Sequence, residues 1–327
     1  MLVDSFGRTI TYLRLSLTDR CNLRCAYCMP EEGIQWMPKE MVITSDEFAR
    51  FVEAAASLGI TKVRLTGGEP LVRRDIVEIV RKIAAIPGIT DLNLTTNAVL
   101  LEKLAKPLKE AGLQRVNISL DTLDPEKFHR ITRFGDYSIV WKGILAAEEA
   151  GLEPIKINSV VVRGLNDDEL PALATLSLDH PWHVRFIELM PVSNDQDWGI
   201  DLPPVEHRYF PVQEMYEKLA GLHLEPVSEI NSGPERTFRI PGAPGTVGFI
   251  SPVGDKFCQE CNRIRMTADG HLRSCLLVDG EINIREALRS GEDLRPYIEQ
   301  AVAAKPEGHK LADRMTPQTR HMSQIGG

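Results

Sequence analysis

The sequence predicts an α/β fold, in which an incomplete (β/α)6 barrel is followed by a smaller C-terminal extension. Strand-like runs alternate with helical runs along residues 1–220, and such alternation is typical of a parallel sheet whose strands are connected by helices. The chain has 327 residues, which suffices for one barrel-sized domain and an appendage. We therefore place the barrel at residues 1–220 and the extension at residues 221–327.

Six runs have the length and composition of strands. They cover residues 11–18, 62–66, 91–97, 115–121, 154–162 and 183–190. Because a closed (β/α) barrel has eight strands, the barrel is predicted to be incomplete.

Helical periodicity fills the intervals between these strands. Thr44 and Glu47 form a predicted capping box at the start of a helix that ends near Leu58, with Gly59 as its stop. Four further helices are predicted at residues 74–86, 101–111, 137–150 and 167–176, although Pro107 weakens the prediction for the second of these.

Polar and apolar side chains alternate along the strands. In the first strand Arg14 and Ser16 share one face, and Leu13 and Leu15 share the other. Buried parallel strands normally read as continuous apolar runs, and unpaired polar groups inside a barrel would cost several kcal/mol each. The interior is therefore expected to hold a polar ligand. An antiparallel sheet with one solvated face would show the same alternation, and this alternative stays open.

Small and polar residues follow the strands at their carboxyl ends, where α/β barrels bind ligands. Gly67-Gly68-Glu69-Pro70 follows the second strand. Its glycines let the backbone approach a ligand closely, and Glu69 offers a carboxylate for an ammonium group. Thr95, Ser119 and Met190 close later strands at the same end.

Three cysteines follow the first strand with the spacing C-x3-C-x2-C, at Cys21, Cys25 and Cys28. Three thiolates this close can face a common centre and leave a four-iron cluster one protein ligand short, so that its free iron can bind and reduce a small molecule. We favour such a cluster. A zinc site or a disulfide is the alternative, although zinc sites usually combine two C-x2-C pairs or add histidines, and no histidine is near.

The other three of the six cysteines form a second triplet, C-x2-C-x13-C, at Cys258, Cys261 and Cys275. An iron–sulfur cluster and a zinc site both fit this spacing. Between them, Asp269-Gly270 is predicted to form a hairpin turn that returns the chain to Cys275. Residues 1–10 lack a secretory signal, and no apolar run approaches the roughly 20 residues of a membrane span. We therefore expect a cytoplasmic enzyme with two metal centres rather than disulfides.

The net charge is −8, with 46 acidic and 38 basic residues, which disfavours a general binder of nucleic-acid polymers. An acidic protein can still gather arginines and lysines in one pocket. An anionic small substrate therefore remains compatible with the composition.

The segment TDRCNLRCAYCMP resembles the cluster motif of the radical S-adenosylmethionine (SAM) enzymes, and GGEP matches their element that holds the methionine portion of SAM. With both triplets considered, residues 11–327 resemble the GTP 3′,8-cyclase family of molybdenum cofactor biosynthesis. The further matching segments are RLTGGEPLVRRD, LTTNAVLL, RVNISLDTLDP, FIELMPV, FCQECNRIRMTADGHLRSCL and the terminal Gly326-Gly327. One departure is Ala98, where the family commonly has glycine.

The resemblance implies that an incomplete (β/α)6 TIM-like barrel carries a catalytic 4Fe–4S cluster on the first triplet. A second 4Fe–4S cluster on Cys258, Cys261 and Cys275 would close its mouth. In this family the first cluster reduces SAM to methionine and a 5′-deoxyadenosyl radical, which takes the 3′ hydrogen of the GTP ribose before the ribose carbon bonds to C8 of guanine. The second cluster binds the guanine through its open iron. The expected enzyme class is a lyase.

Carried over by motif position, the residues expected to contact SAM are Tyr27, Gly68, Ser119 and Met190. Those expected to contact GTP are Arg14, Arg64, Thr95, Lys156, Arg263, Ile264 and Arg265. Arginines suit a triphosphate because a guanidinium can make paired hydrogen bonds. Arg263 and Arg265 also follow closely on Cys261.

The glycine tail, Gly326-Gly327, is expected to reach into the active site as it does in the family. A disordered end and the adenylated terminus of a carrier protein are the alternatives. Besides GTP, the expected partners are an electron donor of unknown identity, the next enzyme of molybdenum cofactor synthesis and a second copy of the chain in a homodimer.

Two other functions stay open. One is a radical SAM enzyme that modifies a peptide with the help of an auxiliary cluster. Such an enzyme would be expected to carry a peptide-recognition domain, often at the N-terminus, whereas ten residues precede the first predicted strand. The other is a zinc-stabilised binding module without catalysis.

Overall fold

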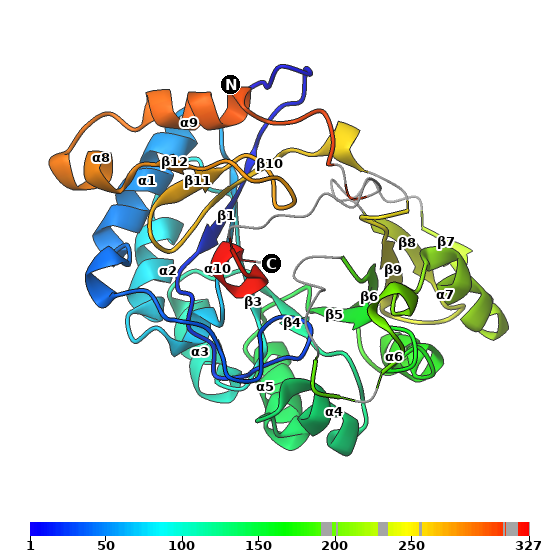
Figure 1. Cartoon of the computed structure of the whole chain (residues 1–327). Helices are drawn as coiled ribbons and strands as arrows, with labels where there is room; N and C mark the ends of the chain where they lie inside the picture. Colours follow the sequence, from blue (N-terminus) through cyan, green and yellow to red (C-terminus); the bar gives the residue numbers. More distant parts are fainter. Residues whose placement is uncertain are drawn as a thin grey trace.

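The computed structural model describes residues 1–190, 198–200, 202–227, 235–254, 257–309, 311 and 320–326. A curved sheet of twelve strands runs through this part of the chain, in the order β12-β11-β10-β1-β2-β3-β4-β5-β6-β9-β8-β7 (Figure 1). Its central strands are β1 (Tyr12–Ser16), β2 (Lys62–Thr66), β3 (Asp91–Thr96), β4 (Arg115–Ser119), β5 (Lys156–Val161) and β6 (His183–Glu188). They pair in parallel and in chain order, which confirms the predicted sheet and excludes the antiparallel alternative for these six strands.

The strands of the C-terminal extension lengthen this sheet at both edges. β9 (Thr246–Ile250) pairs in parallel with β6, and β10 (Arg263–Met266) pairs in parallel with β1. The described sheet therefore has eight consecutive parallel strands, two more than the sequence analysis identified. Because one sheet continues across residue 220, the division into 1–220 and 221–327 stays a prediction.

Short antiparallel strands complete the two edges of the described sheet. They are β7 (Glu225–Pro226) and β8 (Glu235–Arg239) beside β9, and β11 (His271–Arg273) and β12 (Ile282–Asn283) beside β10. The turn between β10 and β11 contains Gly270 at φ +76°, which confirms the predicted hairpin at Asp269-Gly270.

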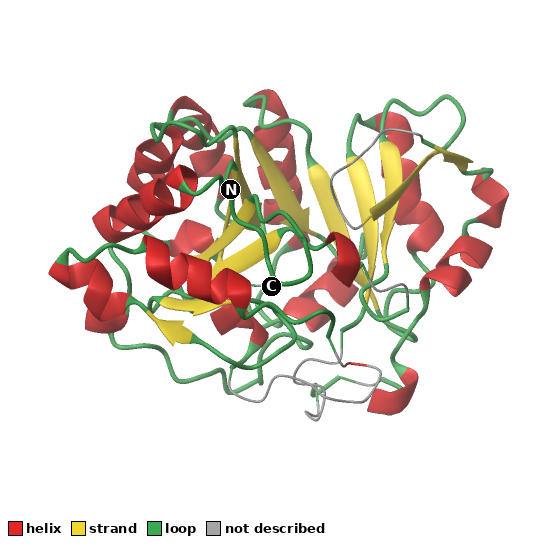
Figure 2. Ribbon diagram, turned by 90° about the horizontal axis from the view of Figure 1, so that it is seen from above, coloured by secondary structure: helices red, strands yellow, loops and turns green. Residues whose placement is uncertain are grey.

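Helices lie on the outer face of the sheet, opposite its interior (Figures 1 and 2). They are α1 (Ser45–Ser57), α2 (Ile76–Ala84), α3 (Leu101–Glu110), α4 (Pro125–Thr132), α5 (Tyr137–Glu149) and α6 (Leu170–Asp179). The predicted capping box is present, since Thr44 Oγ1 accepts from the Glu47 N–H and the Glu47 carboxylate accepts from the Thr44 N–H at 2.7 Å. The short helix α4 was not predicted, and α6 starts three residues later than expected. Helix α3 continues through Pro107.

The apolar side chains of the strands meet these helices in the hydrophobic core. Leu13 and Leu15 of β1 and Val63 of β2 are fully buried in it with Phe48 and Phe51 of α1. Each buried side chain of this size contributes about 1.5–3 kcal/mol relative to exposure. The polar side chains of the same strands consequently face the interior, as the alternation predicted.

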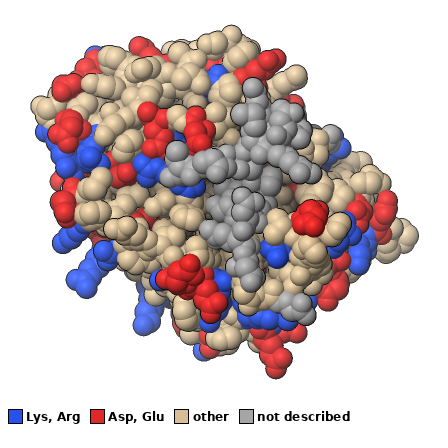
Figure 3. Space-filling view, in the orientation of Figure 1, with Lys and Arg blue, Asp and Glu red and all other residues tan. Residues whose placement is uncertain are grey.

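The described residues also form the helices α7 (Val212–Lys218), α8 (Arg285–Ser290), α9 (Arg295–Ala303) and α10 (Met322–Ile325). Figure 1 shows α10 near the centre of the curved sheet, close to the C-terminus. On the same face, acidic and basic side chains are interspersed over the described surface (Figure 3). Among the described residues, no helix combines the length and apolar character that crossing a membrane requires.

Candidate active site

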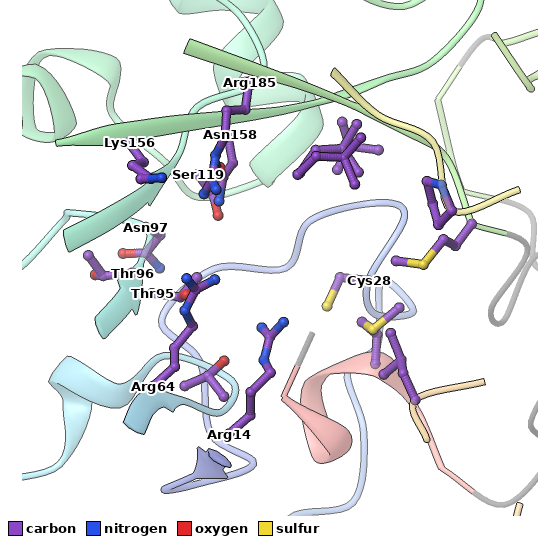
Figure 4. Close-up of a pocket in the computed structure, with 18 of the residues that line it drawn as sticks. Arg14, Cys28, Arg64, Thr95, Thr96, Asn97, Ser119, Lys156, Asn158 and Arg185 are labelled. Carbon is purple, nitrogen blue, oxygen red and sulfur yellow. Dashed lines mark hydrogen bonds between the residues drawn. The ribbon is translucent and has the colours of Figure 1, made fainter. Parts of the chain in front are cut away.

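A cavity of about 390 Å³ lies on the polar face of the sheet. This volume is within the range of small-molecule sites. Its walls come from the barrel strands, the loops at their carboxyl ends, β10 and helix α10. In Figure 4 the guanidinium groups of Arg14 and Arg64 point into the same space, with Cys28 beside them.

All but one of the residues predicted to contact SAM or GTP line this cavity. They are Tyr27, Gly68, Ser119 and Met190 for SAM, and Arg14, Arg64, Thr95, Lys156, Arg263 and Arg265 for GTP. Ile264 is different, because side chains alternate along β10 and that of Ile264 is fully buried in the hydrophobic core. The structure thus places ten of these eleven residues around one cavity. Their contacts with SAM and GTP stay predictions.

The first triplet borders the cavity directly. Cys21, Cys25 and Cys28 are all free thiols that line it. Burial raises the pKa of Cys21 to about 11, aided by the charge of Glu69, and the pKa of Cys28 to about 12, aided by Cys21. Burial and both neighbouring thiols raise the pKa of Cys25 as well. Three thiolates in this place require a positive centre between them, and an iron–sulfur cluster supplies one.

The second triplet adjoins the same cavity. Cys261 lies two residues before β10 and Cys275 lies two residues after β11, so the antiparallel hairpin places both cysteines at its open end. Residues next to the triplet, Phe257, Arg263 and Leu276, line the cavity. Burial opposes ionisation of Cys261, but the charges of Lys305 and Arg263 hold the pKa of this thiol below its usual value. These two cations therefore favour the thiolate form of Cys261, in contrast to the thiols of the first triplet.

The disulfide alternative for the cysteines receives no support. All six are free, which removes the disulfide interpretation.

The GGEP loop packs tightly on the cysteine loop. A Cβ at Gly68 would lie 2.4 Å from the carbonyl oxygen of Arg20, so only glycine fits there. The buried Glu69 carboxylate accepts hydrogen bonds from Thr96 Oγ1 at 2.8 Å and from the Asn97 N–H at 2.7 Å, and burial raises its pKa to about 7. Its predicted ammonium partner stays a prediction.

Buried cations crowd around Tyr12 at the β1 side of the cavity. Arg64 and Arg263 lie over its ring, 5.5 and 5.7 Å from the centroid. Burial lowers the pKa of both Arg64 and Arg265 to about 10, and neighbouring guanidinium groups add to the effect. Such a concentration of buried positive charge favours a multiply charged anion as the ligand.

Two carboxylates offset part of this charge, and the sequence analysis missed both. Asp91 pairs with Lys62 at 3.0 Å and with Arg115 at 2.7 Å. Glu235 contacts three basic side chains, which are His183 at 3.0 Å, Arg185 at 3.0 Å and Lys156 at 3.5 Å. Burial opposes ionisation of Glu235, but the hydrogen bond from His183 and the charge of Arg185 hold its pKa well below its usual value.

Arg185 also lines the cavity without having been predicted. Arg185 shares one face of β6 with His183 and Ile187 and alternates with the buried Val184 and Phe186, which is the signal that could have found it. Over the predicted range 183–190, strict alternation would place Met190 on the same face as Phe186. The strand in fact ends at Glu188, and Phe186 packs on Phe249 in the core.

Tyr27 is fixed in the cavity by a carboxylate. Its hydroxyl donates to Asp121 Oδ2 at 2.6 Å, and Asp121 Oδ1 accepts from the Val160 N–H at 2.8 Å. Burial raises the pKa of Asp121 to about 6, even though the Tyr27 hydrogen bond opposes this.

The C-terminal tail reaches the site. Gly326 is buried at φ +77°, and a Cβ there would lie 2.7 Å from Thr66 Cγ2. Its carbonyl oxygen accepts a hydrogen bond from Arg265 Nη1, while Met322 and Ser323 of α10 line the cavity. Gly327 lies outside the described residues. Ala98, the departure from the family pattern, adopts φ +64°, a conformation that suits glycine.

The chain matches two known protein families. Residues 15–176 match the Radical SAM superfamily, and residues 182–311 match the family described as Molybdenum Cofactor Synthesis C. The fold and the first cysteine triplet thus define the class of radical SAM proteins.

Relatives with the name GTP 3′,8-cyclase match the whole chain. The protein of Listeria monocytogenes is 47% identical over 338 residues, covering 100% of this chain and 99% of its own. That of Moorella thermoacetica is 47% identical, and that of Pelotomaculum thermopropionicum is 46% identical, each over 99% of both chains. The chain belongs to the GTP 3′,8-cyclase family.

The fold is also similar to that of Streptococcus suis SuiB. The SAM-bound structure has 16% identity and a TM-score of 0.59 over 89% of this chain and 68% of that one. The structure with precursor peptide SuiA has 14% identity and a TM-score of 0.62 over 94% and 73% of the two chains. This likeness shows the fold alone, so it does not favour the peptide-modifying alternative.

Proposed function

We propose that the protein is a radical SAM GTP 3′,8-cyclase, a lyase that performs the first step of molybdenum cofactor biosynthesis. One observation carries this proposal. A single cavity adjoins both cysteine triplets and gathers ten of the eleven predicted SAM and GTP residues, in a chain 47% identical over its length to GTP 3′,8-cyclases.

Cys21, Cys25 and Cys28 would hold the first 4Fe–4S cluster, which supplies the electron for reductive cleavage of SAM. Gly68 lets the GGEP loop pack directly on the cysteine loop, and its backbone lines the cavity where the methionine portion of SAM would bind. Tyr27, which Asp121 holds in place, and Ser119 and Met190 would complete the SAM contacts.

Arg14, Arg64, Lys156, Arg263 and Arg265 would bind and orient GTP through its triphosphate. Two buried polar atoms of the site support a polar ligand, since Thr95 Oγ1 and Arg263 Nε have no hydrogen-bond partner among the described residues. An unsatisfied buried polar atom costs about 1–3 kcal/mol. A bound nucleotide would remove that cost.

Cys258, Cys261 and Cys275 would hold the second 4Fe–4S cluster, which offers an open iron to the guanine. The main chain of Ile264 would remain the only part of that residue able to approach GTP. The tail at Gly326 would help to close the site. An electron donor, the next enzyme of the biosynthesis, a homodimer and a cytoplasmic location remain parts of this proposal.

Anaerobic reconstitution tests the proposal. The wild-type protein should contain roughly eight irons per chain, the sum for two four-iron clusters. After reduction with dithionite it should consume SAM and GTP together and release 5′-deoxyadenosine. Failure to form 5′-deoxyadenosine in the presence of both substrates would refute the proposal.

A cysteine variant separates the two clusters. Cys275→Ala should lower the iron content by about half and abolish cyclisation while it spares SAM binding. Retained cyclisation in this variant would refute the role given to the second triplet.

A further inference from the structure

Lys305, just beyond α9, is a buried cation next to the second cysteine triplet. Its side chain is almost fully buried, since the residue is 4% exposed. The ammonium group donates to the carbonyl oxygens of Arg263 at 2.8 Å and Ser274 at 3.0 Å, and it lies 3.6 Å from Cys261 Sγ. An ammonium has three N–H donors, so each of them has a partner.

These three partners lie in two separate segments of the chain, one that carries Cys261 and one that carries Cys275. Arg263 follows Cys261 on the first strand of the hairpin, whereas Ser274 directly precedes Cys275 beyond the second strand. One side chain therefore links the segments that carry these two cysteines. Because the links are hydrogen bonds of defined direction, they fix the separation of the two thiols.

The chain around Lys305 also lies against the third cysteine. A Cβ at Gly308 would be 3.7 Å from Cys258 Sγ. Arg8 Nη1 donates to the carbonyl oxygens of Cys258 at 2.6 Å and Glu307 at 2.9 Å, and so attaches residues 305–308 to the cysteine loop. The N-terminal segment thus supports the same site.

The charge of Lys305 has the triplet as its counterpart. In the described part of the chain, the ammonium group contacts the Cys261 sulfur and two carbonyl oxygens, and no carboxylate forms an ion pair with it. A buried charge without a partner is costly. A cluster that becomes more negative on reduction would provide the strongest partner.

We propose that Lys305 is a positioning residue for the second iron–sulfur cluster, which holds Cys261 and Cys275 in place and raises the cluster's reduction potential through its N–H···S contact and its charge. Hydrogen bonds to ligand sulfurs and nearby charge are established influences on such potentials. The inference rests on the proposed function, in which the second triplet carries a four-iron cluster.

The test measures both clusters in the intact enzyme. Wild type and the variants Lys305→Met, Lys305→Gln and Lys305→Arg are reconstituted anaerobically, and each cluster is titrated with dithionite and followed by electron paramagnetic resonance. The signal that changes on addition of SAM belongs to the first cluster and serves as an internal control. Lys218→Met, which changes a half-exposed lysine, controls for the loss of a lysine.

Lys305→Met should shift the one-electron reduction equilibrium of the second cluster at least tenfold toward the oxidised form, which is about 59 mV. The potential of the first cluster should not change. Lys305→Gln should resemble Lys305→Met because it lacks the charge, and Lys305→Arg should recover most of the wild-type potential.

An unchanged potential of the second cluster in Lys305→Met and Lys305→Gln would overturn the proposal. If Lys305→Met loses about half of the iron, retention of that iron in Lys305→Arg supports the positioning role. Equal loss of iron in all three variants would identify Lys305 as a packing residue and would overturn the proposal. A wild-type enzyme without a second cluster would instead refute the proposed function.

Discussion

Arg265 Nη1 donates a hydrogen bond to the carbonyl oxygen of Gly326, which follows it by 61 residues in the chain. The C-terminal tail therefore engages a guanidinium that we propose to bind GTP. Gly326 is packed closely against β1 and β2 at this point. A Cβ added to Gly326 would lie 2.7 Å from Thr66 Cγ2 and 3.3 Å from Ser16 Cβ. The tail and the nucleotide site are thus structurally coupled.

Gly326→Ala should displace the tail. The added methyl group would meet Thr66, and the left-handed φ of +77° costs an L-residue about 1–2 kcal/mol. We expect faster amide hydrogen exchange over residues 320–326 and slower cyclisation by roughly tenfold, the factor that 1.4 kcal/mol represents. Gly242→Ala is the matched control, because Gly242 has φ +79° with no atom within 4 Å. Equal exchange in both variants would disprove the steric coupling.

Arg64→Gln should weaken GTP binding. The side chain is buried in the cavity, and its Nε already donates to Asn93 Oδ1 at 2.6 Å, which orients the remaining donors. A hydrogen bond to a charged group contributes about 1.5–3 kcal/mol, so the dissociation constant should rise roughly 10- to 100-fold. Equilibrium dialysis with GTP measures this. Arg295→Gln, at an exposed arginine, should bind GTP as wild type does, and equal affinity in the two variants would remove Arg64 from the site.

Glu235→Gln should destabilise the fold. The carboxylate is buried and pairs with Arg185 and His183, so its loss leaves these groups without their negative partner. Loss of one member of a buried pair costs about 3–5 kcal/mol. Because the folded pKa is depressed, the contribution is fully present above the unfolded value of 4.5 and is lost only as the pH falls below it. Urea unfolding at pH 7 measures the cost, and Glu225→Gln is an exposed control. Equal midpoints in both variants would contradict this role.

The wild-type protein should lose stability relative to Asp121→Asn as the pH rises through 6. Burial raises the folded pKa of Asp121 from 3.8 to about 6, so the folded state binds a proton in this range that the unfolded state lacks. Without SAM, the relative loss between pH 5.5 and 8 should be about 1 kcal/mol, since one pKa unit is 1.36 kcal/mol. Thermal unfolding of both proteins across this range is the measurement. A difference that does not vary with pH would exclude a raised pKa.

The sequence predicted the central sheet because each strand carries its own signal. Alternation around residues such as Arg14 and Lys156 identified both the strands and the face that lines the cavity. Strands β9 and β10 were missed because no predicted helix connects them to the barrel, so their pairing with β6 and β1 depends on tertiary structure.

The candidate site could likewise be predicted only in part from the sequence. Cysteine spacing located both triplets, and motif resemblance located ten residues that line the cavity, whereas the side chain of Ile264 lies in the hydrophobic core. Glu235 and Lys305 could not be found in this way. Each is a single charged residue whose role depends on partners that are distant in the sequence, Arg185 for Glu235 and Cys261 for Lys305.

Deuterium transfer tests the central claim most directly. Anaerobically reconstituted, reduced enzyme is incubated with SAM and GTP that carries deuterium at the 3′ carbon of the ribose. The account predicts one deuterium in the released 5′-deoxyadenosine and a nucleotide product cyclised between that carbon and C8 of guanine. Unlabelled 5′-deoxyadenosine, or a cyclised product that retains the deuterium, would contradict it.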